Sequence, residues 1–230
     1  MAPERIRGVF LDVGETLVDE TRVWDGWADW LGVPRFTFHA AIGEAIERGA
    51  PHTEVFELFR PGFDLRAERA ARRAEGALWA VEERDLYPDV RPALERLRAD
   101  GYLVGISGNQ PDGMTHALRA LHLPVDLIEN SADWGVEKPD PAFFVRVAAL
   151  AGVPPARIAY VGDRLDNDVL PARAAGMVSV FLRRGPWALA HARWPQAQLA
   201  SARIATLTEL PNLLASFEAD TRNEDHPEPT

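Results

Sequence analysis

Six short, nearly all-apolar segments alternating with helical stretches are the feature that most limits how this chain can fold. Strands that are apolar on both faces are typical of parallel sheets covered by helices on both sides. The alternation therefore predicts an α/β fold with a parallel sheet. The expected strands cover residues 9–13, 102–107, 125–130, 157–162, 178–183 and 202–206.

Residues 20–86 interrupt this alternation and have the pattern of continuous helix. Trp24, Trp27 and Leu31 share one helical face, which is typical of core packing. Prolines divide the block into about four helices, the last of them expected over residues 65–84. A helical block placed after the first strand of a sheet is a candidate cap domain.

The expected domain boundaries follow from these patterns. We expect a catalytic core formed by residues 1–17 and 87–218, with a helical cap at residues 18–86. The polar tail, residues 219–230, is expected to lack fixed structure because it offers little apolar surface to bury.

Charge and composition exclude several classes of function. A net charge of -10 argues against a broad basic surface for nucleic acid. The chain has no cysteine, so disulfides, thiolate zinc sites and cysteine nucleophiles are excluded. No segment approaches the ~20 apolar residues of a membrane span, and the start lacks a signal-peptide pattern. We therefore expect a cytoplasmic protein without membrane or nucleic-acid partners, either a monomer or a homodimer.

Polar residues follow four of the expected strands, and ligands bind at this end of open parallel sheets. Each of these residues alone is explained as a turn, cap or surface residue, as Asp140 is by an N-cap position before Pro141. As a set they place carboxylates, a hydroxyl and an ammonium at adjacent strand ends. The set comprises Asp12, then Ser107, Gly108 and Asn109, then Lys138, and finally Asp163 and Asp168.

Such an oxygen-rich cluster suits Mg²⁺, because its carboxylates would repel one another without a cation. A cation together with Lys138, the only lysine in the chain, would attract a phosphate group. A carboxylate nucleophile that forms an acyl phosphate would split phosphoryl transfer into two easier steps.

These residues, in this order, resemble the four motifs of the haloacid dehalogenase superfamily of phosphatases and related hydrolases. The match spans roughly residues 8–185 and consists of Asp12-Val-Gly-Glu-Thr16, Ser107, Lys138 in EKPDP, and GDRLDND at 162–168. The resemblance implies a Rossmann-like, doubly wound core with an all-helical cap inserted after the first motif. It also implies a Mg²⁺-dependent phosphatase that acts on a small phosphorylated metabolite through an aspartyl-phosphate intermediate.

The resemblance further implies a role for each matching residue. Asp12 would be the nucleophile, and Lys138 would bind phosphate and stabilise the intermediate. The metal ligands would be Asp12, the backbone carbonyl of Gly14, Asp163 and Asp168. The substrate-binding residues would be Thr16, Ser107, Gly108, Asn109 and Lys138.

Gly14 departs from the family pattern, since phosphatases of this family usually carry a second aspartate there. Glycine keeps the carbonyl that binds the metal and loses the side chain that protonates the leaving group. Glu15 could supply the missing acid/base group, or the substrate could have a good leaving group that needs little acid. A cap carboxylate could also serve.

Two further alternatives remain open at this point. The chain could be a non-catalytic phosphate-binding or regulatory protein. It could also be a 2-haloacid dehalogenase-type hydrolase, since these enzymes lack the second aspartate as well. The acidic pattern of Asp163 and Asp168 argues against the dehalogenase, which does not need a metal.

Overall fold

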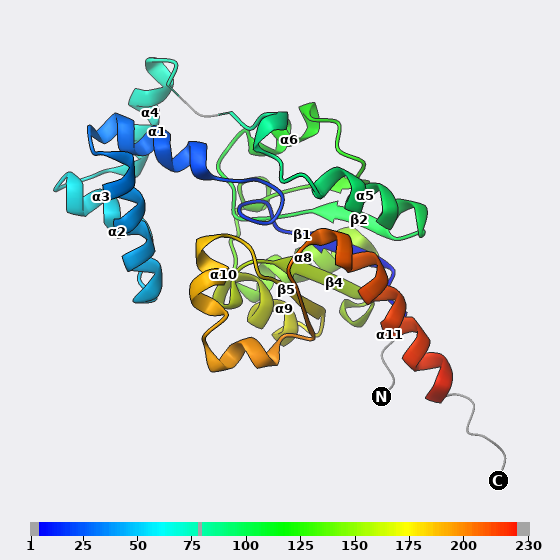
Figure 1. Cartoon of the computed structure of the whole chain (residues 1–230). Helices are drawn as coiled ribbons and strands as arrows, with labels where there is room; N and C mark the ends of the chain where they lie inside the picture. Colours follow the sequence, from blue (N-terminus) through cyan, green and yellow to red (C-terminus); the bar gives the residue numbers. More distant parts are fainter. Residues whose placement is uncertain (1–4, 78–79, 225–230) are drawn as a thin grey trace, which may run out of the picture. The chain divides into compact units, whose positions relative to one another are not determined.

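The computed structural model describes residues 5–77 and 80–224, and these fall into two compact units (Figure 1). The helical unit is Asp19–Asp85, and the core unit contains the described residues before and after it. Each boundary of the helical unit differs by one residue from the expected range of 18–86. Among the described residues, no helix is both long and apolar enough to cross a bilayer.

The core unit is built on a six-stranded sheet in the order β3-β2-β1-β4-β5-β6, and every neighbouring pair is parallel. The prediction of a parallel α/β sheet is therefore confirmed. All six expected strands are present, and each is shorter than expected. They are β1 (Gly8–Leu11), β2 (Leu103–Ile106), β3 (Leu127–Ile128), β4 (Ile158–Gly162), β5 (Val178–Leu182) and β6 (Ala202–Ile204).

Helices cover both faces of the sheet, because the chain crosses from β1 toward β3 and then returns to the other side of β1. One group packs through an apolar cluster that includes Phe10, Phe143 and Tyr160. The α-helices of the described core are α5 (Val90–Ala99), α6 (Met114–Ala120), α7 (Ser131–Trp134), α8 (Pro141–Ala151), α9 (Leu170–Ala174), α10 (Gly185–His191) and α11 (Leu210–Glu224). The expected doubly wound arrangement is confirmed.

The C-terminal helix corrects one expectation. Helix α11 continues to Glu224, so the prediction that residues 219–230 lack fixed structure is wrong for 219–224. The sequence of this stretch explains the difference, since it contains no proline before Pro227 and includes good helix formers such as Ala219. Residues 225–230 lie outside the described part of the chain.

The helical unit contains α1 (Thr21–Leu31), α2 (Arg35–Glu47), α3 (Glu54–Phe59) and α4 (Leu65–Ala74). Trp27 is buried among aromatic rings, with its ring centroid 4.9 Å from that of Phe56, so the packing role expected for it holds. The helix expected over 65–84 instead ends at Ala74, because Gly76 adopts a left-handed conformation with φ of 67°.

Candidate active site

Three neighbouring strands deliver the main polar residues to one edge of the sheet. Asp12 directly follows β1, and its N–H donates to the Val161 carbonyl of β4 at 2.9 Å. Ser107 directly follows β2, and Asp163 directly follows β4. Because β1 lies between β2 and β4, residues distant in sequence meet at the point where the strand order reverses.

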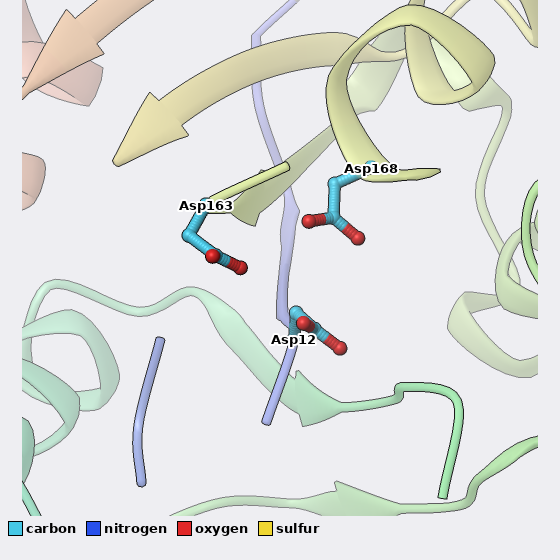
Figure 2. A group of neighbouring side chains, drawn as sticks. All are labelled: Asp12, Asp163 and Asp168. Carbon is cyan, nitrogen blue, oxygen red and sulfur yellow. The ribbon is translucent and has the colours of Figure 1, made fainter. Parts of the chain in front are cut away.

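The carboxylates of Asp12, Asp163 and Asp168 form a buried cluster in which one oxygen of each lies within 4.8 Å of the others. Figure 2 shows the three side chains converging from separate segments of the chain. Among the described residues, Asp163 Oδ2 is buried and has no hydrogen-bond partner. Hard oxygen ligands at this spacing, one of them unpaired, fit a divalent cation such as Mg²⁺.

Burial makes two of these carboxylates, Asp163 and Asp168, costly to ionise in the absence of a metal ion. It raises the pKa of Asp163 well above its ordinary value, and the charges of Asp168, Asp12 and Glu15 raise it further. Burial also raises the pKa of Asp168 to about 6, although nearby Lys138 opposes the shift. A bound cation would remove this penalty by neutralising the cluster.

Lys138 is the cation that the structure already places in this cluster. Its Nζ donates to Asp12 Oδ1 and to Asp168 Oδ1, each at 2.6 Å, and its side chain is fully buried. Burial alone would lower the pKa of Lys138, but the charges of Asp12 and Asp168 outweigh it and hold the pKa well above normal. The ammonium therefore stays charged and orients both carboxylates.

Asn109 holds the loop that carries Lys138. Its Nδ2 donates to the Lys138 carbonyl at 2.8 Å, and its Oδ1 accepts from the Lys138 N–H at 2.7 Å. The expectation from the sequence was a substrate contact, whereas the structure commits both amide atoms to the backbone of Lys138. This pairing joins residues 29 apart, so no local pattern could have indicated it.

Asp140 accepts from Ala142 N–H as the N-cap of α8, as predicted.

Asp168 lies on an irregular turn before α9. The chain forms a π-helical turn at Leu165–Val169. In this turn Asp168 Oδ2 accepts from the Arg164 N–H at 2.9 Å. Gly162 leaves room for the carboxylate, since a Cβ on Gly162 would lie 2.3 Å from Asp168 Oδ2. Single π-turns of this kind are frequent at functional sites.

Ser107 and Thr16 contribute hydroxyl groups. Both side chains are completely buried, and within the described residues neither Oγ atom has a hydrogen-bond partner. The Ser107 carbonyl accepts from Tyr160 Oη at 2.7 Å, which fixes the end of β2 against β4. Tyr160 was missed by sequence reasoning, although a phenol within an apolar strand is itself a signal that a polar partner lies nearby. Two unpaired buried hydroxyls could donate to an anion.

Gly14 and Glu15 lie on the turn that follows Asp12. Gly14 is half-buried, and Glu15 is a buried non-glycine residue with a left-handed φ of 52°. Glu15 Oε2 accepts from Tyr87 Oη at 2.6 Å. The Glu15 carboxylate also packs against Gly185, where an added Cβ would lie 2.5 Å from Oε2. The structure therefore places the Glu15 side chain against Tyr87 and the turn after β5.

Gly108 was expected to bind substrate, and the structure shows that it makes room for Asp12. A Cβ on Gly108 would lie 2.3 Å from Asp12 Oδ1, which is closer than any ordinary contact. We expect Gly108→Ala to displace the Asp12 carboxylate and to lower kcat by about 10²-fold, the typical cost of a 1 Å misplacement. Steady-state kinetics would measure this loss.

Gly8→Ala is the matched control for this substitution. Gly8 lies on β1, the strand that Asp12 follows, and an added Cβ there would make ordinary contacts of 3.7 to 3.8 Å. Its kcat should stay close to that of the unmodified chain. If Gly108→Ala retained full activity with an unchanged melting temperature, the close approach of Gly108 to Asp12 would have no catalytic importance.

Comparison with known proteins gives a consistent result. A family model described as haloacid dehalogenase-like hydrolase matches residues 6–176. Glyceraldehyde 3-phosphate phosphatase of Methanopyrus kandleri is 41% identical over 104 residues, which is 44% of this chain and 45% of that protein.

Two other matches cover nearly the whole chain. The protein of the same name from Pyrococcus furiosus is 28% identical over 94% of this chain and 95% of its own. A crystal structure of a HAD phosphatase from Thermococcus onnurineus superposes with a TM-score of 0.59 at 26% identity, covering 91% of this chain and 98% of that one.

Proposed function

The chain belongs to the haloacid dehalogenase-like hydrolase family, and we propose that it is a Mg²⁺-dependent phosphatase for a small phosphorylated metabolite. The observation that carries the proposal is Lys138 bridging Asp12 and Asp168 inside a buried carboxylate cluster. Burying these charged groups lowers the stability of the folded protein. A metal ion would be bound by the carboxylates, and a phosphate group would be stabilised by the metal ion and Lys138. The phosphatase names of the relatives support the same substrate class.

Asp12 would act as the nucleophile. Its carboxylate oxygen would attack phosphorus to form an aspartyl phosphate, and water would then hydrolyse that intermediate. Lys138 holds Asp12 Oδ1 at 2.6 Å, which fixes the carboxylate and places a positive charge beside the phosphoryl group. The buried hydroxyls of Ser107 and Thr16 would donate to phosphoryl oxygens.

Mg²⁺, when bound, would neutralise charge on the phosphoryl oxygens. Asp12, Asp163, Asp168 and the carbonyl of Gly14 would hold it, which gives the unpaired oxygen of Asp163 a partner. Asn109 has a positioning role in this proposal, because it secures the backbone of Lys138 through two hydrogen bonds.

An assay with acetyl phosphate and p-nitrophenyl phosphate tests the proposal, with Mg²⁺ present and with EDTA. We expect phosphate release that requires the metal and is lost on chelation, because the carboxylate cluster would then lack its cation. Phosphate or Mg²⁺ binding without turnover on a broad panel would instead establish a binding protein. Metal-independent halide release from a 2-haloacid would establish a dehalogenase.

A further inference from the structure

We infer that the described core unit provides no proton donor for the leaving group, so that its chemistry favours an activated phosphate, either an acyl or an aryl phosphate, over an alkyl phosphate. This inference rests on the proposed function and narrows its substrate class. Its first basis is the set of hydrogen bonds and ion pairs that hold the buried titratable side chains of the described core. Its second basis is whether the leaving oxygen of each class of phosphate must receive a proton.

Glu15 follows Gly14 directly in the sequence, but its side chain is already held elsewhere. It is 5% exposed, accepts from Tyr87 Oη at 2.6 Å and packs against Gly185. The guanidinium of Arg184 lies 4.1 Å from the centre of the Tyr87 ring and donates to the Thr16 carbonyl at 2.9 Å. These contacts fix Glu15, Tyr87 and the turn around Thr16 together.

Arg184 is anchored in turn by Asp89. The two side chains form an ion pair, and Asp89 Oδ2 also accepts from the Leu207 N–H at 2.8 Å. The network therefore extends from the turn after Asp12 to the start of α5 and the segment after β6. Moving the Glu15 carboxylate toward a substrate would break the Tyr87 hydrogen bond and disturb this whole network.

Asp12 and Asp163 are assigned to the nucleophile and to the metal site, and the other buried titratable groups of the described core form hydrogen bonds or ion pairs. Lys138 is paired with Asp12 and Asp168, and Tyr160 Oη donates to the Ser107 carbonyl. His191 Nδ1 accepts from the Leu165 N–H at 3.1 Å. Gly14 itself carries no side chain, so in the described core no acid is placed to donate to a leaving group.

The consequence for the reaction follows from the electron balance. When the Asp12 oxygen bonds to phosphorus, the bond from phosphorus to the leaving oxygen breaks, and that oxygen keeps the electron pair. A carboxylate, whose conjugate acid has a pKa of ~4, or a phenolate, whose conjugate acid has a pKa of ~10, can depart as an anion. An alkoxide is far more basic and must receive a proton, and general acid help of this kind is typically worth ~10²–10⁴-fold.

The second step needs no such acid. Water forms a bond to phosphorus, the bond from phosphorus to the Asp12 oxygen breaks, and the electron pair returns to the Asp12 carboxylate. The proton lost by water leaves with the phosphate product or passes to solvent. A carboxylate is a good leaving group here for the same reason that an acyl phosphate is a good substrate.

Three phosphates of graded leaving group provide the experiment: acetyl phosphate, p-nitrophenyl phosphate and glycerol 3-phosphate, each assayed with Mg²⁺. We expect kcat/KM for the first two to exceed that for glycerol 3-phosphate by ~10²-fold or more. Equal rates on all three would overturn the inference and leave the proposed function intact. Absence of metal-dependent release from any of them would overturn the proposed function, and the inference with it.

Gly14→Asp tests the missing acid directly, with Gly14→Asn as the matched control. We expect Gly14→Asp to raise kcat/KM for glycerol 3-phosphate by ~10-fold or more relative to Gly14→Asn, with little difference between the two on acetyl phosphate. Titration with inorganic phosphate by calorimetry would show that both variants retain a formed site. Equal activity of the two variants on glycerol 3-phosphate would contradict the inference.

Glu15→Gln separates positioning from proton transfer. Loss of the Glu15 charge should change hydrolysis of all three substrates by a common factor, because the effect would pass through the turn that carries Asp12. A selective loss of glycerol 3-phosphate hydrolysis would instead identify Glu15 as the acid and overturn the inference.

Discussion

Asp12→Asn is expected to lower kcat by on the order of 10⁴-fold or more, because an amide oxygen cannot form the acyl phosphate. The substitution keeps the size of the side chain and leaves an oxygen that can accept from Lys138 Nζ, which lies 2.6 Å from Asp12 Oδ1. The loss should therefore appear in turnover while the core remains folded. Single-turnover assays with acetyl phosphate would measure it.

Covalent trapping provides the second measurement for Asp12. Acid quenching of the unmodified chain during turnover should leave an acid-stable, base-labile phosphate on the protein, and Asp12→Asn should leave none. The melting temperature of the variant, followed by circular dichroism, is the control for folding. Retention of more than ~1% of the activity with an intact fold would show that Asp12 is not the nucleophile.

Lys138→Met is expected to damage both stability and activity. It removes the cation between Asp12 and Asp168 and leaves two buried carboxylates facing each other without compensation. Breaking a buried pair by removing one partner typically costs about 3–5 kcal/mol of unfolding free energy. Loss of the charge beside the phosphoryl group should also lower kcat by ~10²–10³-fold.

Denaturant unfolding without metal and kinetics with Mg²⁺ would measure the two effects of Lys138→Met separately. Arg96→Met is the matched control, since Arg96 pairs with Asp100 on the surface and such pairs are worth about 0–1 kcal/mol. Lys138→Arg should recover only part of the stability. The guanidinium keeps the positive charge, but it is larger and planar, whereas the fully buried position holds a compact ammonium group. A Lys138→Met chain as stable and active as the control would contradict the role assigned to this ion pair.

The sequence by itself determined the α/β class, because short, nearly all-apolar strands that alternate with helices are typical of a parallel sheet covered on both faces. It also determined which residues gather at the edge of the sheet. Asp12, Ser107 and Asp163 each follow a strand directly, and parallel strands end at a common edge. The position of each residue directly after a strand was therefore sufficient to predict from the sequence that the three side chains converge.

Helix ends were less predictable, since they depend on single residues and on marginal local energies. Gly76 ended α4 ten residues before the expected boundary of 84, whereas α11 continued past residue 218. The π-helical turn that orients Asp168 has no periodic signature, because it depends on the contacts that the carboxylate makes with the backbone of Arg164.

Only the tertiary structure decided what the remaining polar side chains do. Glu15 is held by Tyr87, 72 residues later in the chain, and Asn109 is committed to the backbone of Lys138. A hydrogen bond acts over about 3 Å and needs the correct direction, and sequence separation constrains neither across a fold. The sequence therefore determined which groups reach the edge of the sheet, and the tertiary structure decided which of them are already occupied.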